Sequence, residues 1–192
     1  LSLYQMNQMD GRSDEVNDNW LPSIMAVNHM GLASSRIRAL TLRYALVEGD
    51  ARDSTLSSLE NTKRDLETTE RLYEPLISSS EERTLYDRYK AAKALYMEQS
   101  ALAVSLSRSG DLATTRQVVA HALGEQAEKV AAALDDLIRI NDEGARRAAA
   151  TSKAAFNNSV KIVLFIILVA VVLTAALALI FTRSLVTPLV QA

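Results

Sequence analysis

The stretch IVLFIILVAVVLTAALALIF, residues 162–181, decides the architecture of this chain. Its twenty residues include no charged residue, no glycine and no proline. At about 1.5 Å of rise per residue, a helix of this length spans roughly 30 Å, the thickness of the hydrocarbon core of a bilayer. A core helix of a soluble protein would be shorter or show a polar face, and a signal peptide would lie at the N-terminus. We therefore expect a membrane-spanning helix over residues 160–182, with the preceding residues forming a membrane-anchored domain.

The composition of the chain is typical of long helices. Only six glycines and three prolines occur in 192 residues, and 5% of the residues are aromatic. The formal net charge of −2 argues against a nucleic-acid-binding surface, and the absence of cysteine excludes disulfides and thiolate metal sites. We expect no cofactor, no metal and no nucleic-acid partner. Since the sequence starts with Leu1 and stops at Ala192 in mid-pattern, we also expect it to be part of a longer protein.

Three breaks divide residues 10–159 into four helical segments. They lie at 48–50 and 109–111, where a glycine precedes an aspartate, and at 75–80, where a proline precedes three serines. Glycine commonly ends helices, and aspartate or serine commonly starts them. Between the breaks, apolar residues recur every three or four positions, and no strand-like alternation occurs. The predicted fold is all-α: an up-down-up-down four-helix bundle that continues into a transmembrane helix.

The first segment, about residues 11–47, carries two apolar rows. The first row follows a seven-residue repeat, as a bundle seam requires: Leu21, Met25, Asn28, Leu32, Ser35, Ala39, Leu42 and Leu46. The second row lies beside it: Met30, Ala33, Ile37, Leu40, Tyr44 and Val47. A helix with two such rows often packs both inside its own bundle and against a partner chain. Residues 1–9 are either the end of an earlier membrane helix or a lead-in to this segment.

Sequence motifs of enzymes are absent. The chain has no phosphate-binding glycine loop, no zinc-protease motif and no nucleophile elbow. His29 and His121 are isolated from clustered carboxylates, so each is better explained as a seam or surface residue than as a metal ligand. We predict neither a catalytic site nor a metal site.

Polar side chains on or beside the seams are the best binding candidates. Arg36 and Arg43 lie seven residues apart on one face of the first segment, at a depth that matches Tyr96 on the third. Arginine offers paired donors to a carboxylate, and hydroxyl and amide groups satisfy its remaining lone pairs. We predict an anion site formed by Arg36, Arg43, Lys93, Tyr96, Gln99, Thr114 and Thr115. The sequence leaves open the alternative that the arginines are solvated charges whose stems cover apolar neighbours.

Two further motifs carry a family resemblance. Residues 183–189 read RSLVTPL, and a proline–leucine pair just after a membrane helix is similar to the opening of a HAMP linker. The first segment contains SSRIRALTLRYAL, residues 34–46, which is similar to the arginine-bearing first helix of Tar-like sensor bundles. Together with the bundle and the membrane helix, these motifs resemble a bacterial methyl-accepting chemotaxis receptor (a chemoreceptor) over nearly all of the chain.

The resemblance implies a ligand-binding bundle at residues 10–159 in the periplasm, a helix at 160–182 in the bacterial inner membrane, and the start of HAMP at 183–192. It also implies a homodimer, able to form higher oligomers, that pairs through the first helix and holds a small organic acid at the distal end of the interface. Arg36 and Arg43 match two family arginines, whereas the third would fall near Val47, which is apolar. This departure argues against an amino-acid ligand such as aspartate and leaves other organic acids open. We favour di- or tricarboxylates such as malate or citrate, with aromatic acids next. Four basic residues precede the membrane stretch and one follows it, which weakly argues for the opposite orientation, so the periplasmic placement comes from the resemblance.

Three functions therefore remain open. A chemotaxis receptor would signal through a region C-terminal to this chain to cytoplasmic partners of the CheA/CheW type. The same bundle could be the input domain of a sensor histidine kinase. A module that binds a partner protein, or a structural dimer tether, would need an exposed apolar patch at the tip, and the loop at 109–111 offers none.

Overall fold

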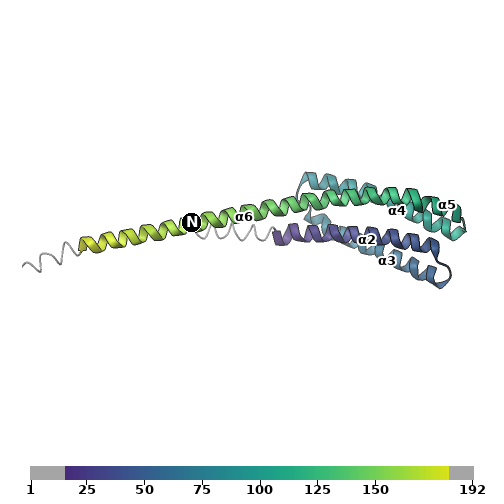
Figure 1. Ribbon diagram of the computed structural model, residues 1–192, viewed down its shortest axis with the longest axis horizontal. Coiled ribbons are helices and arrows are strands. Elements are labelled where there is room, and N and C mark those ends of the chain that lie inside the picture. The colour runs from purple at the N-terminus through teal and green to yellow at the C-terminus, as the bar shows by residue number, and fades with distance from the viewer. Residues whose placement is uncertain (1–15, 182–192) are drawn as a thin grey trace, which may run out of the picture. The chain divides into compact units, whose positions relative to one another are not determined.

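The computed structural model describes residues 16–181, all of its elements being helical. In chain order they are η1 (Val16–Trp20), α2 (Leu21–Leu46), α3 (Asp50–Tyr73), η2 (Glu74–Leu76), α4 (Ser80–Ser109), α5 (Leu112–Gln117), η3 (Val118–Ala122) and α6 (Leu123–Phe181). Residues 16–181 include no strand, which confirms the all-α four-helix prediction. The chain divides into two compact units, and one of them, residues 14–147, is the bundle. Figure 1 shows α2, α3, α4 and the first part of α6 side by side in this unit.

The predicted breaks coincide with the helix ends. Gly49 and Gly110 have φ angles of 57° and 83°, in the left-handed region that glycine adopts most readily. The Ser79 hydroxyl accepts a hydrogen bond from the Glu82 amide at 3.1 Å and begins α4. The Asp111 carboxylate accepts one from the Thr114 amide at 3.0 Å and begins α5. Each cap satisfies an amide that the first helical turn leaves without a partner.

The core of the bundle corrects one assignment on α2. The row with the seven-residue repeat is exposed along almost its whole length, and Leu32 and Leu46 are 69% and 82% exposed. The core is lined by the adjacent face, whose buried residues are Ser23, Val27, Met30, Ser34, Ile37, Thr41 and Tyr44. The prediction that the row with the seven-residue repeat forms the bundle seam is therefore wrong. On α6 the residues Leu123, Val130, Ala133, Leu137 and Ile140 lie in the core.

A polar cluster around the buried Glu82 joins α6 to α3 and α4; we call Tyr73, Ser78, Glu82 and Asn141 the carboxylate cluster. Glu82 is 1% exposed, and its carboxylate accepts from the Tyr73 hydroxyl at 2.7 Å, the Asn141 amide at 3.0 Å and the Ser78 amide at 2.9 Å. Burial and the Glu82 carboxylate raise the pKa of Tyr73 well above its ordinary value, because both oppose a phenolate. The cluster fixes the position of α6 relative to α4.

The second unit contains residues 148–181 of the described chain. Side chains of residues 162–180 are exposed on nearly every face of the helix, including Leu164, Phe165 and Leu179. Among the described residues, one helical stretch is long and apolar enough to cross a membrane, and its most apolar window is not buried in the structure. A helix that is apolar on all sides suits lipid on all sides. The predictions for residues 1–9 and 183–192 lie outside the described residues.

Candidate functional site

The two predicted arginines lie on the outer surface of α2. Arg36 and Arg43 are exposed, and within residues 16–181 neither side chain forms a hydrogen bond or an ion pair. They are therefore available to an external partner or ligand.

Tyr96 forms a hydrogen bond inside the bundle. It is buried and donates its hydroxyl hydrogen to the Ser34 carbonyl at 2.8 Å. Burial raises the pKa of Tyr96 well above the ordinary value, and the nearby Arg38 charge opposes this only in part. Tyr96 therefore packs against α2 from the core side, whereas the two arginines point away from the core.

The other predicted residues are held by internal contacts or lie apart from the arginines. Lys93 donates to Glu70 at 2.6 Å, and Gln99 is half-buried. The Thr115 hydroxyl donates to the carbonyl of the residue that caps α5, at 2.7 Å, while Thr114 is exposed in the first turn of that helix. One copy of the chain thus does not gather the seven predicted residues around one cavity.

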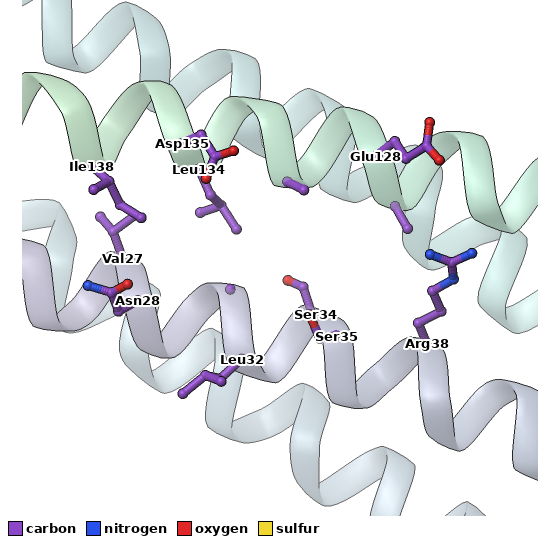
Figure 2. Close-up of a pocket in the computed structure, with 13 residues that line it drawn as sticks. Val27, Asn28, Leu32, Ser34, Ser35, Arg38, Glu128, Leu134, Asp135 and Ile138 are labelled. Atoms are coloured by element: carbon purple, nitrogen blue, oxygen red, sulfur yellow. The ribbon is translucent and has the colours of Figure 1, made fainter.

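A groove between α2 and α6 provides a binding-sized space next to the arginine-bearing face of α2. Its volume is about 400 Å³, which falls within the range of small-molecule pockets. Its apolar walls include Val27, Leu134 and Ile138, and Figure 2 shows these side chains facing across the space from the two helices. The α2–α6 groove is lined by Val27, Asn28, Gly31, Leu32, Ser34, Ser35, Arg38, Ala127, Glu128, Ala131, Leu134, Asp135 and Ile138.

Charged and polar groups lie at defined places in the α2–α6 groove. Arg38 extends from α2 toward α6 (Figure 2), and its guanidinium is 3.4 Å from the point where a Cβ on Gly124 would lie. Glu128 and Asp135 lie on the α6 side, and neither forms an ion pair within the described part of the chain. The Ser34 hydroxyl is buried without a hydrogen-bond partner among the described residues. The groove therefore offers one cation, a free hydroxyl and two carboxylates.

The exposed row of α2 defines the positions of the arginines in a heptad repeat. When its seven-residue repeat is written as a heptad, Leu32 occupies position a and Ser35 occupies position d. Arg36 and Arg43 then occupy position e on one side of the row, and Arg38 occupies position g on the other. Both sides of the exposed row are therefore flanked by guanidinium groups.

Four polar residues that line the groove are not among the residues predicted from the sequence: Arg38, Ser34, Glu128 and Asp135. Arg38 lies beside the row that the sequence places inside the bundle, whereas the structure exposes that row. The sequence does contain a signal for a role of Arg38. In the seven-residue repeat, Arg38 lies two residues after Arg36 and on the opposite side of the same apolar row. No group of three or more histidine, cysteine, aspartate or glutamate side chains within residues 16–181 is arranged to hold a metal ion.

Comparison with known proteins identifies the family. The family model described as a four helix bundle sensory module for signal transduction matches residues 1–156, which is most of the chain. No curated protein matches the chain. The family match confirms the resemblance to chemotaxis-receptor sensor bundles and agrees with the four helices of the structure. The chain belongs to the family of four-helix-bundle sensory modules for signal transduction.

Proposed function

We propose that this chain is the periplasmic sensor and membrane anchor of a bacterial chemotaxis receptor that binds a small organic anion, with di- or tricarboxylates such as malate or citrate favoured. The observation that carries the proposal is the exposed apolar row of α2 with arginines on both flanks. A seven-residue apolar repeat on a helix surface is the signature of pairing with a second helix. The helix that we propose to pack on this row is α2 of a second copy, because it carries the same seven-residue repeat.

Parallel pairing of α2 with a second copy would bring the arginines together. Position g of one helix lies opposite position e of the following heptad on its neighbour. This register sets Arg38 of one copy opposite Arg43 of the second, and Gly31 opposite Arg36 of the second. Three guanidiniums would then surround the α2–α6 groove, and the carboxylates of Glu128 and Asp135 would offset two of the three positive charges. A ligand carboxylate held by paired guanidinium donors would neutralise the charge that remains.

The remaining predicted residues have supporting places in this proposal. Tyr96 fixes the Ser34 carbonyl on the core side of the α2–α6 groove, and Lys93 is held by an ion pair inside the bundle. Gln99, Thr114 and Thr115 stay predictions.

A ligand that binds more tightly to one offset of α6 would shift the helix that continues toward the membrane, and only such differential affinity can transmit a signal. CheA/CheW-type partners would receive it through the region that follows the chain.

The test is a ligand screen of the whole chain in lipid nanodiscs, with unfolding followed through Trp20, the single tryptophan. We expect malate or citrate to raise the melting temperature, because a ligand at 100 times its Kd stabilises the folded state by about 2.7 kcal/mol. Arg36→Ala, Arg38→Ala and Arg43→Ala should each abolish the shift. Arg71→Ala, an exposed arginine on α3, serves as the matched control and should retain it.

A second variant checks the sign of the ligand's charge. Asp135→Asn removes a carboxylate from the α2–α6 groove and should tighten the binding of a dicarboxylate, because like charges repel across a short distance. Weaker binding in Asp135→Asn would instead identify a ligand with its own cation. If no acid changes the melting temperature, the chain is better explained as a partner-binding module or a dimer tether.

A further inference from the structure

Two exposed lysines lie just before the most apolar stretch of α6. Lys161 directly precedes residues 162–181, which carry no charge, and Lys153 lies eight residues earlier on the same helix. Both side chains are exposed, as is that of Asn157 midway between them. Residues four apart are neighbours on a helix surface, so the three side chains form one ridge. We call Lys153, Asn157 and Lys161 the lysine ridge.

The charges of the lysine ridge have no partner, unlike those of the other four lysines. Each lysine in the bundle unit forms an ion pair at 2.6 to 3.3 Å: Lys63 with Glu60, Lys90 with Asp87, Lys93 with Glu70 and Lys129 with Glu125. Lys153 and Lys161 form none within residues 16–181, and the sequence contains no acidic residue after Glu143. Both positive charges are therefore available to an anion outside the described chain.

The side of α6 opposite the lysine ridge carries small residues. Ala148, Ser152, Ala155 and Ser159 follow one another at intervals of three and four residues and are half-buried. At 3.6 residues per turn, this row lies on the far side of the helix from the lysine ridge. The positive charge before the apolar stretch is therefore confined to one side of α6.

The length of the lysine ridge matches the outer layer of a bilayer. The ridge starts at the edge of the apolar stretch and extends about 12 Å along the helix, at about 1.5 Å of rise per residue. The headgroup layer on each side of a bilayer is about 5–8 Å thick. A lysine carries its charge on a flexible four-carbon stem that bends toward this layer. Both ammonium groups can therefore reach the lipid phosphates.

We propose that the lysine ridge binds the headgroup phosphates of anionic phospholipids at the membrane surface. The two ammonium groups bind phosphate as point charges, and the exposed Asn157 amide donates to a phosphate oxygen. The occupant is a lipid surface because the ridge continues directly into a stretch that is apolar on all sides, which suits lipid. This inference rests on the membrane anchor proposed above and uses no residue of the anion site on α2.

The test is local fluorescence quenching by lipids in nanodiscs, with the whole chain labelled on a single cysteine. The chain has no native cysteine, and Asn158→Cys places the fluorophore at an exposed position beside the lysine ridge. The nanodiscs contain phosphatidylcholine and phosphatidylglycerol, and each lipid in turn carries a quenching nitroxide close to its headgroup. We expect phosphatidylglycerol to be enriched at the label by at least about fivefold, the contribution of one lysine near an anionic surface. High salt should reduce the enrichment through screening.

Variants then assign the enrichment to the lysine ridge. Lys153→Gln combined with Lys161→Gln should remove the preference for phosphatidylglycerol, whereas Lys153→Arg combined with Lys161→Arg should retain it, because arginine also binds phosphate. Lys129→Gln, which removes an exposed lysine paired with Glu125 in the bundle, is the matched control and should leave the preference unchanged.

The outcomes separate this proposal from the membrane anchor. Equal quenching by the two lipids, or an enrichment that survives the double glutamine variant, would overturn lipid binding by the lysine ridge and leave the anchor intact. Quenching by neither lipid would contradict the anchor itself and, with it, this proposal.

Discussion

At the residue scale, Glu82 has the most demanding environment in the bundle. Its carboxylate is almost fully buried and lies among neutral donors from Tyr73, Ser78 and Asn141. Buried charges are tolerated only where hydrogen bonds replace those to water. Glu82→Ala should lower the free energy of unfolding by about 3 kcal/mol, because it leaves the buried Tyr73 hydroxyl and the part-buried Ser78 amide without their acceptor.

Chemical denaturation measures this loss, and Glu81→Ala is the matched control. Glu81 is the adjacent residue in the same helical turn but is exposed, so its replacement should cost less than about 1 kcal/mol. Equal effects of the two substitutions would mean that the carboxylate cluster does not stabilise the bundle.

The buried tyrosines predict an alkaline loss of stability. Burial raises the pKa of Tyr86 to about 12, and burial with nearby carboxylates raises those of Tyr73 and Tyr89 further. Below about pH 10 both the folded and the unfolded tyrosines are protonated, so stability does not depend on them. Above about pH 10 the unfolded state loses protons that the folded state retains, and stability falls by about 1.4 kcal/mol per pH unit for each such tyrosine.

Tyr96→Phe tests this prediction on a single side chain. Burial also raises the pKa of Tyr96, so removing its hydroxyl should make the fall in stability above about pH 10 shallower by about 1.4 kcal/mol per pH unit. The measurement is urea denaturation at several pH values between about 8 and about 12. An unchanged slope would show that Tyr96 ionises equally in the folded and unfolded states.

At the element scale, two glycines show how closely α6 packs. A Cβ at Gly144 would overlap the Trp20 ring, whereas a Cβ at Gly31 would meet only Leu134 at 4.0 Å. Gly144→Ala should therefore destabilise the bundle by about 1–3 kcal/mol through overpacking. Gly31→Ala should stabilise it by about 0.5–1 kcal/mol, because alanine is the better helix former.

Thermal unfolding of the two alanine variants gives opposite shifts in this account. A higher melting temperature for Gly144→Ala would mean that the Trp20 ring moves aside at little cost. Trp20 fluorescence reports that movement directly, since no other tryptophan is present.

The helical elements were predictable from the sequence to within a few residues, because glycine and proline are rare and mark the breaks. The apolar character of residues 162–180, in a helix long enough to cross a membrane, was equally clear from their composition. The buried face of α2 was not, because both of its faces carry apolar side chains at helical spacing. Ser34 and Thr41 lie in the core, whereas Leu32 and Leu46 do not, so hydrophobicity alone favoured the wrong row. The α2–α6 groove was not predicted for the same reason. The place of Arg38 beside the apolar row indicates a binding role only once that row is known to face outward.

At the scale of the whole molecule, the exposed row explains why one copy leaves the arginines apart. Burying Leu32 and Leu46 against a second copy would remove apolar surface from water and, in the proposed register, would give Arg38 two guanidinium neighbours. An anion would then link the two copies, and its binding would be coupled to how they pack. Under this proposal the sensory role depends on how α2 pairs rather than on any single cavity.

The most direct test of this account is a cysteine cross-link, which the absence of native cysteine makes unambiguous. Ser35 occupies position d of the exposed row, where a residue in a parallel pair faces its own counterpart within the reach of a disulfide. Under mild oxidation in nanodiscs, Ser35→Cys should form a covalent dimer in high yield, whereas Ser57→Cys on the exposed face of α3 should not. A dimer from Ser35→Cys alone is the predicted result. Equal yields from the two variants, or no cross-link through Ser35→Cys, would contradict pairing through α2 and the anion site built on it.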